Sequence, residues 1–184
     1  HVRSRRQRQM CIRDRRAASS LNNNKLRGIG LSTYIEACSG GGPEEATIIL
    51  EKDGNLTLHI GTQSNGQGHE TAYKQILCEF LGIAPEKMTV IQGDSDLIAF
   101  GAGTGGSRSV PVGGSAIRVA SENIIEETKS LAAIKLNVNK DLLEYKEGIF
   151  LVEGTNLTIS LEDLAKESDA PVSYTHLRAH ETRH

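Results

Sequence analysis

GAGTGGSRSVPVGGSAIRVA, residues 101–120, is the stretch that decides the fold. Its first nine residues hold four glycines, a threonine, two serines and an arginine, and an apolar run with helical spacing follows. Such a loop presents backbone N–H groups, hydroxyls and one cation to whatever lies against its main chain. A second glycine-bearing loop, GTQSNGQGHET at residues 61–71, also leads into a predicted helix. We therefore expect the two loops to clasp one phosphorylated cofactor between them.

The two ends of the chain differ from its middle. Residues 1–16 hold seven arginines and one aspartate, and residues 172–184 hold three of the six histidines. The strings MCIRDR and VSYTHLRAHET within them resemble translated sequencing-adapter read-through at the ends of metagenomic gene fragments. We therefore expect two artefactual tails that pack against nothing, with residues 17–171 as the domain of interest. A basic nucleic-acid-binding arm at the N-terminus is the alternative.

Charge and hydropathy limit the partners of the middle segment. The whole chain carries −2, while residues 1–16 carry +6 and residues 172–184 carry +1, so that residues 17–171 carry −9. An acidic body argues against a nucleic-acid surface, although a local nest of N–H groups can still bind a small anion. No apolar run approaches the roughly 20 residues of a membrane span, and no signal peptide is visible. We expect a cytoplasmic protein that binds neither nucleic acid nor membrane.

Cysteine usage indicates no metal centre and no disulfide framework. Cys11 lies in the first tail, which leaves Cys38 and Cys78 far apart in the body. Two distant cysteines match no metal-binding spacing. They are interpreted as small core hydrophobes.

Hydrophobic periodicity predicts an α+β fold with mixed strands and two main helices. Alternating apolar residues on either side of Asp53-Gly54 predict a hairpin of strands at 46–50 and 56–60, with His59 facing outward. Helices are expected at residues 69–81 and 112–131. The other expected elements are strands at 28–38 and 88–92, a hairpin at 142–152, and a strand leading into a capped helix at 158–166. A regular βαβ repeat is missing, which favours α+β over α/β.

Each predicted helix has an apolar stripe that we expect to face the core, and Gly82 is placed to end the first helix. In the first helix the stripe consists of Ala72, Ile76, Leu77, Phe80 and Leu81. In the second helix it consists of Ala116, Val119, Ala120, Ile124 and Leu131, with Glu122, Glu126 and Glu127 facing outward.

Single motifs in the two loops are weak indicators. Residues 101–106 read G-x-G-x-x-G, but a Rossmann site needs a strand ending at the first glycine and an acid at the end of the next strand. Here residues 94–100 intervene, and Glu126 and Glu127 lie within a predicted helix. Ser107 stands where a Walker loop needs lysine, and Tyr73 interrupts a possible HExxH zinc motif.

A longer series of motifs is more specific. It consists of GQGHET at 66–71, Gln75, LGI at 81–83, GDSD at 93–96 and GTGGSRS at 103–109. From about residue 28 to 131, the series resembles the molybdopterin-binding large subunit of the xanthine dehydrogenase, aldehyde oxidase and carbon monoxide dehydrogenase family. GQGHET and GTxGSRS look most like the carbon monoxide dehydrogenase-like bacterial branch. Ser95 stands where that branch usually has threonine, and the change keeps the hydroxyl.

The resemblance implies a set of cofactor-binding residues. Gln67 would hydrogen-bond the pyranopterin, since an amide can donate and accept at once. Residues 104–109 would wrap the pterin and its pyrophosphate, and Arg108 could pair with a phosphate bidentately. The alternative for Arg108 is an ion pair with Asp94 or Asp96. The full expected set is Gly66, Gln67, Gly68, His69, Thr104, Gly105, Gly106, Ser107, Arg108 and Ser109.

The resemblance also implies a function and a division of labour. The chain would be a fragment of a molybdenum hydroxylase large subunit that binds molybdopterin, in the cytosine dinucleotide form. The parent would hydroxylate an aldehyde, a purine-like heterocycle or a CO-type substrate with oxygen from water. Iron–sulfur clusters need four cysteines each, so FAD and the 2Fe-2S clusters would lie on partner subunits or domains, in a dimer of heterotrimers.

The family's catalytic glutamate lies toward the C-terminus of the subunit, in a motif that this sequence lacks. We therefore expect no catalytic residue and no metal ligand among the 184 residues, and an inactive fragment. Two alternatives stay open: a nicotinamide-dependent oxidoreductase with a Rossmann-type loop, and a non-catalytic degenerate domain of the same fold. A longer reading frame would distinguish all three interpretations. A downstream glutamate motif supports the molybdenum hydroxylase, a βαβ repeat supports the nicotinamide enzyme, and loss of the glutamate supports the degenerate domain.

Overall fold

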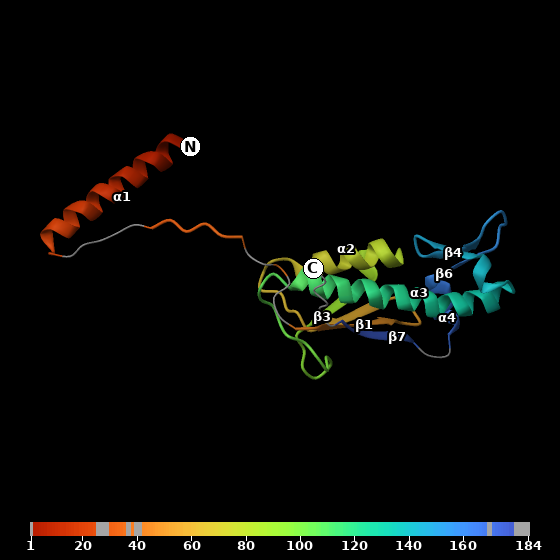
Figure 1. Cartoon of the computed structure of the whole chain (residues 1–184). Helices are drawn as coiled ribbons and strands as arrows, with labels where there is room; N and C mark the ends of the chain where they lie inside the picture. Colours follow the sequence, from red (N-terminus) through yellow and green to blue (C-terminus); the bar gives the residue numbers. More distant parts are fainter. Residues whose placement is uncertain (1, 25–29, 36–37, 39–41, 169–170, 179–184) are drawn as a thin grey trace. The chain divides into compact units, whose positions relative to one another are not determined.

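The computed structural model describes residues 2–24, 30–35, 38, 42–168 and 171–178 (Figure 1). The chain divides into two compact units, His1–Ile35 and Glu36–His184. In the first unit, helix α1 spans Val2–Asn22, and the side chains of residues 9–18 are exposed. The boundary expected at residue 16 therefore falls inside a helix that the sequence analysis did not predict.

The strand predicted at 28–38 is wrong for the part of it that the structure describes. Residues 30–35 and 38 have no strand conformation. Leu31, Tyr34 and Ile35 are almost fully exposed, with 97% of Ile35 accessible. β-Branched and aromatic residues favour a strand only when a pleated surface packs against them, and no strand among the described residues pairs with residues 30–35.

The second unit is built on a four-stranded sheet with the order β3-β2-β1-β7. Strands β1 (Glu44–Leu50) and β2 (Leu56–Ile60) form the predicted antiparallel hairpin, with Ile48 opposite Leu58. Strand β3 (Met88–Gln92) was also predicted, and it runs parallel to β2. Because side chains alternate between the two faces of a strand, Leu56, Leu58 and Ile60 are buried while His59 is half-buried on the other face.

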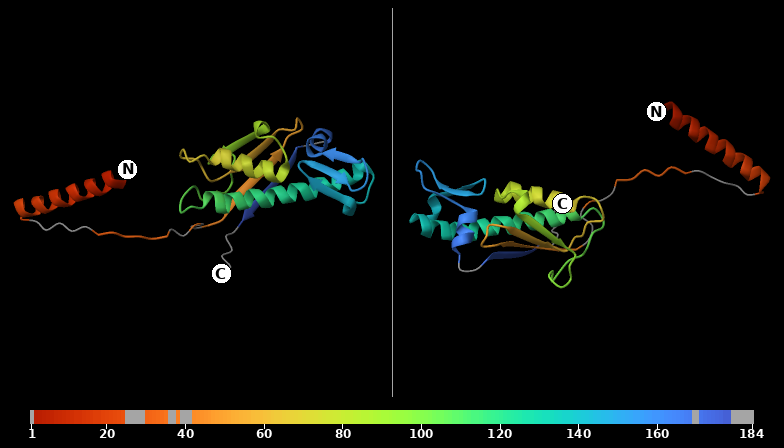
Figure 2. Two further views of the ribbon diagram at one scale, coloured as in Figure 1. Left: turned by 90° about the horizontal axis from the view of Figure 1, so that it is seen from above. Right: turned by 180° about the vertical axis from the view of Figure 1, so that it is seen from behind.

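Two helices lie side by side over one face of this sheet (Figures 1 and 2). They are α2 (His69–Leu81) and α3 (Gly114–Leu136). The core between helices and sheet has no exposed surface at Ile48, Leu58, Leu77, Ile117 and Ile124. Burying each such side chain contributes about 1.5–3 kcal/mol, so this layer contact dominates the stability of the unit. The predicted α+β fold is confirmed.

The apolar faces of α2 and α3 differ from the sequence prediction at Tyr73 and at Leu131. Gly82 ends α2 in the left-handed conformation, with φ of 59°, as expected. Tyr73 is fully buried, although the predicted stripe omitted it in favour of Ala72, which is half-buried. Leu131 is 38% exposed, so its predicted inward position is wrong. The buried face of α3 passes instead through Thr128 and Ala132.

The start of α3 also differs from the prediction. The first turn, Ser109–Gly113, is a π-helical segment called η2, and the regular α-helix begins at Gly114. The turn lies directly after the 101–109 glycine loop. Wide π turns of this kind occur often at functional sites.

A small second sheet covers the far end of α3 (Figure 2). Strands β4 (Leu143–Lys146) and β5 (Ile149–Val152) form the predicted hairpin around Glu147-Gly148, and β6 (Thr158–Ser160) pairs with β5. Helix α4 (Leu161–Glu167) follows, capped by the Ser160 hydroxyl, which accepts from the Asp163 N–H at 3.0 Å. Two short 3-10 turns, η1 (Pro85–Lys87) and η3 (Lys140–Leu142), lead into β3 and β4.

The expectation that residues 172–184 pack against nothing is wrong for strand β7 (Val172–Arg178). This strand pairs antiparallel with β1 along its whole length, and Val172 is buried. The open edge of β1 offers a row of N–H and C=O groups that an extended segment can satisfy. The origin of the segment stays a prediction. Within the described residues, none of the helices has the length and apolar character needed to cross a membrane.

Candidate cofactor-binding site

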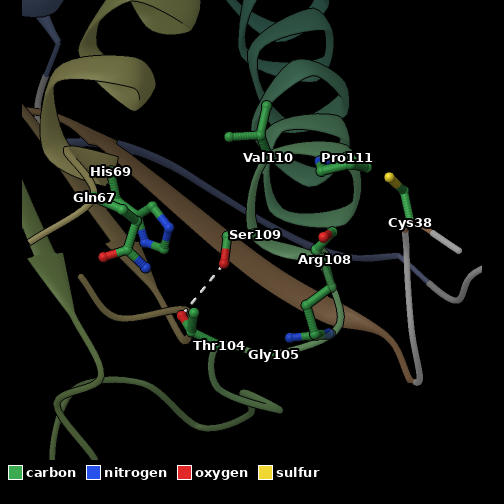
Figure 3. Close-up of a pocket in the computed structure, with 10 residues that line it drawn as sticks. Cys38, Gln67, His69, Thr104, Gly105, Arg108, Ser109, Val110 and Pro111 are labelled. Carbon is green, nitrogen blue, oxygen red and sulfur yellow. Dashed lines mark hydrogen bonds between the residues drawn. The ribbon is translucent and has the colours of Figure 1, made fainter. Parts of the chain in front are cut away.

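A cavity of about 360 Å³ lies where the two glycine loops meet (Figure 3). Seven of the ten predicted site residues line it, and Gly66, Gly68 and Gly106 are their neighbours in the same loops. Cys38, Val110 and Pro111 complete the wall. The seven are Gln67, His69, Thr104, Gly105, Ser107, Arg108 and Ser109. The structure thus brings residues some 40 positions apart in the sequence around one space.

The two loops are tied directly to each other by hydroxyl groups. The Thr104 hydroxyl donates to the carbonyl oxygen of Gln63 at 2.6 Å. The Ser109 hydroxyl then donates to the Thr104 oxygen at 3.3 Å, the contact drawn in Figure 3. Each loop therefore limits the conformation of the other.

The Tyr73 hydroxyl, on α2, forms hydrogen bonds to both loops. Its hydroxyl lies 2.6 Å from the Thr62 hydroxyl and donates to the Ser109 carbonyl oxygen at 3.2 Å. Burial raises the pKa of the Tyr73 phenol above its ordinary value near 10.0, because a phenolate would be desolvated there. The phenol therefore stays neutral and keeps donating its proton to Ser109.

Arg108 is held inside the chain. Its side chain is 3% exposed and forms an ion pair with Glu44 at the start of β1. The guanidinium also donates to the carbonyl oxygens of Gly103 at 2.7 Å, Pro43 at 2.7 Å and Gly42 at 3.1 Å. The carboxylate in this ion pair belongs to Glu44, and not to Asp94 or Asp96 as the sequence alternative had it. The expected pairing of Arg108 with a phosphate stays a prediction.

The backbones of the two loops approach each other closely at two glycines. A Cβ atom on Gly61 would overlap the backbone of Gly101 and the Glu44 carboxylate. Only a residue without a side chain fits such an approach. Gly105 shows the opposite: a Cβ there would meet no described atom within 4 Å. Gly61 and Gly101 are glycines because the chain packs on itself, whereas Gly105 leaves open space at the cavity wall.

Two helix N-termini face the cavity. Helix α2 begins at His69 and η2 begins at Ser109, and both residues line the cavity. None of the described side chains caps either start. The first N–H groups of a helix lack intrahelical partners and carry a partial positive charge, so an anionic group fits between them.

His69 and Gln67 add polar side chains to this wall. His69 is 5% exposed, and its Nδ1 atom is buried without a hydrogen-bond partner among the described residues. A buried polar atom of this kind costs free energy unless a further group pairs with it. Gln67 is exposed, and its amide oxygen accepts from the Asn65 N–H and from the Ser64 hydroxyl at 3.4 Å. These residues fit a polar, anionic cofactor.

The Rossmann alternative is wrong. Residues 93–108 separate β3 from η2, so the G-x-G-x-x-G sequence does not join a strand directly to a helix. A nicotinamide site of that type needs a direct connection from strand to helix, because this connection places the pyrophosphate on the helix N-terminus at the strand end.

A model of the molybdopterin cofactor-binding domain family matches residues 6–183. The chain belongs to this family. The carbon monoxide dehydrogenase large chain of Hydrogenophaga pseudoflava is 37% identical over 145 residues, which are 72% of this chain. The gamma subunit of the 6-hydroxypseudooxynicotine dehydrogenase complex of Paenarthrobacter nicotinovorans is 36% identical over 142 residues, which are 77% of this chain. The chain spans 18% of each of these relatives.

A solved structure shares the architecture. Reconstituted CO dehydrogenase from Oligotropha carboxidovorans superposes with a TM-score of 0.73 at 28% identity. The match covers 91% of this chain and 24% of the other. The fold described above is therefore that of one piece of a molybdopterin-binding large chain.

Sequence reasoning missed the buried polar residues that support the site. Glu44, Thr62 and Tyr73 have no exposed surface; Glu44 and Tyr73 lie outside the two glycine loops, and Thr62 lies in the 61–71 loop but was not among the expected site residues. The one signal that could have indicated Tyr73 is its spacing, since it lies four residues from His69 and four from Leu77 on the buried face of α2.

Proposed function

We propose that this chain binds molybdopterin across the cavity between the 61–68 loop and the 101–109 loop. The observation that carries the proposal is the meeting of both loops and both helix N-termini at one cavity wall. A cavity of about 360 Å³ accommodates part of a pterin dinucleotide, in the usual size range of small-molecule sites. Membership of the molybdopterin cofactor-binding family supports the same ligand.

The residues divide by the chemistry that they offer. The N–H groups at His69 and Ser109 and the backbone of Gly105 accept close approach by a phosphate. The hydroxyls of Thr104, Ser107 and Ser109 and the amide of Gln67 bond polar edges of the cofactor. Gly66, Gly68 and Gly106 let the main chain turn toward it, and Gly66 and Gly68 have positive φ of 95° and 79°. Arg108 supplies the one cation of the proposed set.

The parent protein is proposed to be a molybdenum hydroxylase with the cytosine dinucleotide form of the cofactor. The bound molybdenum would supply the redox and oxygen-transfer chemistry, while this chain's residues hold and orient the cofactor. The substrate is proposed to be an aldehyde, a purine-like heterocycle or a CO-type molecule, and the carbon monoxide dehydrogenase among the relatives supports the last of these. FAD and 2Fe-2S clusters are carried by partner subunits or domains, in keeping with the word "complex" in one relative's name. A cytoplasmic location belongs to the same proposal.

Metal and nucleotide analysis of the cofactor-loaded protein tests the proposal. Gln67→Ala removes an amide hydrogen bond, and we expect about tenfold weaker cofactor retention, which corresponds to roughly 1.4 kcal/mol. Gln75→Ala is the matched control, because Gln75 is an exposed glutamine of α2 that does not line the cavity. Molybdenum content and released cytosine nucleotide are measured for both. Equal retention in the two variants would contradict the proposed site.

A further inference from the structure

Glu44 is a buried acid that the proposed cofactor contacts do not use. It lies at the first position of β1, and none of its surface is exposed. One carboxylate oxygen, Oε2, accepts from Arg108 Nη1. The other, Oε1, has no hydrogen-bond partner among the described residues. It lies against the contact between Gly61 and Gly101, since Cβ atoms built on these glycines meet it.

The Arg108 guanidinium joins two separate parts of the chain, residues 42–44 and the 101–109 loop. Its acceptors lie in residues 42–43 before the sheet, in Glu44 on β1, and at Gly103 within the 101–109 loop. Carbonyl oxygens alone satisfy its N–H groups but do not neutralise its charge. Glu44 supplies the neutralising carboxylate in a place that water does not reach, and a buried charge without one is strongly unfavourable.

The loop conformation next to Arg108 needs such an anchor. Ser107 has φ of 51°, a left-handed conformation that a residue with a side chain adopts at a cost. Ser107 and Ser109 flank Arg108, and all three line the cavity. A conformation of this kind persists only where the surroundings hold it. The Arg108 guanidinium, at the centre of this segment, is held by the Glu44 carboxylate and by backbone carbonyl oxygens.

We infer that Glu44 is a positioning residue for the cofactor cavity, and that it acts through Arg108. The ion pair holds the 101–109 loop in the shape that presents Ser107 and Ser109 to the ligand. This inference rests on the proposed function of the cavity, because the loop shape matters for binding only if the cofactor lies there. Glu44 itself touches no ligand.

Hydrogen exchange on the full chain tests the positioning role without any cofactor. Glu44→Gln keeps the size of the side chain and removes the charge. We expect amides of residues 101–109 to exchange at least about tenfold faster, while the β4–β5 hairpin at the far end of α3 is unchanged. Glu45→Gln is the matched control, one residue along the same strand on its other face. Equal loop exchange in the two variants would overturn the inference.

A double variant separates positioning from stability, and it also serves if Glu44→Gln does not fold. Glu44→Leu combined with Arg108→Met replaces the pair by apolar side chains, an exchange that often keeps or raises stability. We expect Tm to recover in the double variant while loop exchange stays fast. A loop as protected as in the unmodified chain would show that the pair contributes stability alone, and would overturn the inference.

Cofactor retention in the loaded protein completes the test. Molybdenum content should fall about tenfold or more in Glu44→Gln and stay unchanged in Glu45→Gln. Fast loop exchange with full molybdenum retention would overturn the link between Glu44 and the cavity. That outcome is distinct from failure of the proposed site, which the Gln67→Ala comparison reports independently of loop motion.

Discussion

The two ends of α3 are stabilised by different kinds of contact. At its start, the 101–109 loop is held by buried polar groups, above all Arg108 on Glu44 and the Tyr73 hydroxyl on Ser109. At its far end, α4 and the β4–β6 sheet pack through apolar side chains such as Phe150 and Leu161. Apolar burial is strong but non-directional, whereas hydrogen bonds require particular distances and angles. The difference indicates that apolar packing at the far end contributes stability without fixing a particular geometry, whereas the polar contacts at the loop end fix the geometry of the 101–109 loop.

The largest expected effect is at the apolar end. Phe150 has no exposed surface, and its ring lies 4.8 Å from that of Tyr145 between centroids. Phe150→Ala should reduce the free energy of unfolding by about 3–5 kcal/mol, through lost burial and the cavity left behind. Ile149→Ala, at the exposed neighbouring position, should cost less than about 1 kcal/mol. Denaturant unfolding measures both, and equal losses would contradict an apolar far end.

Much of this architecture could be predicted because local patterns determine it. The β1–β2 hairpin follows from Asp53-Gly54 between alternating apolar residues, and the end of α2 follows from Gly82. The prediction failed where tertiary contacts decide. Residues 30–35 have strand-like composition without a packing surface, and β7 is a strand because β1 has an edge to pair with.

The candidate site was predictable to the same extent and for the same reason. The glycine and hydroxyl motifs pointed to Gln67 and Thr104, and both line the cavity, while their contact with a cofactor stays a prediction. Arg108 could be located, but its ion-pair partner could not, since Glu44 is 64 positions away in sequence and no local rule relates them. Buried polar support depends on which strands and loops meet, and a single sequence does not reveal that.

A medium effect is expected at two tyrosines, one at each end of α3, of which Tyr73 is fully buried and Tyr145 is half-buried. Tyr73→Phe removes the hydrogen bonds of the Tyr73 hydroxyl to the Thr62 hydroxyl and to the Ser109 carbonyl oxygen, which keeps the Gly114 N–H as a donor, and should cost about 1–3 kcal/mol. Tyr145→Phe removes one hydrogen bond, to the Leu81 carbonyl oxygen at 2.9 Å, and should cost about 1 kcal/mol. Only Tyr73→Phe should also speed hydrogen exchange in the 101–109 loop. Faster loop exchange in both variants would contradict the division between the ends.

The same two residues predict an alkaline pH dependence. Burial raises the pKa of both phenols above the ordinary 10.0. Each phenol therefore stays protonated in the folded chain at pH values where it ionises in the unfolded chain. Stability contributed this way is complete below pH about 10 and is lost as the pH rises further. Unfolding measured from pH 8 to 11 should show a shallower decline in either Tyr→Phe variant, and an unchanged slope would contradict burial of that phenol.

The smallest expected effect is at an exposed ion pair, which sharpens the contrast with Arg108 and Glu44. Lys135 Nζ of α3 lies 2.6 Å from Glu167 Oε2 of α4, but the two side chains are 49% and 50% exposed. Water screens such a pair, so a double-mutant cycle with Lys135→Gln and Glu167→Gln should give a coupling of about 0.2–1 kcal/mol. The cycle also cancels the separate interaction of each charge with its helix dipole. At 1 M salt, where the screening length is about 3 Å, the coupling should vanish. A coupling that persists in salt would mean that charge pairs at the far end of α3 also fix geometry, and that the two ends differ less than their contacts indicate.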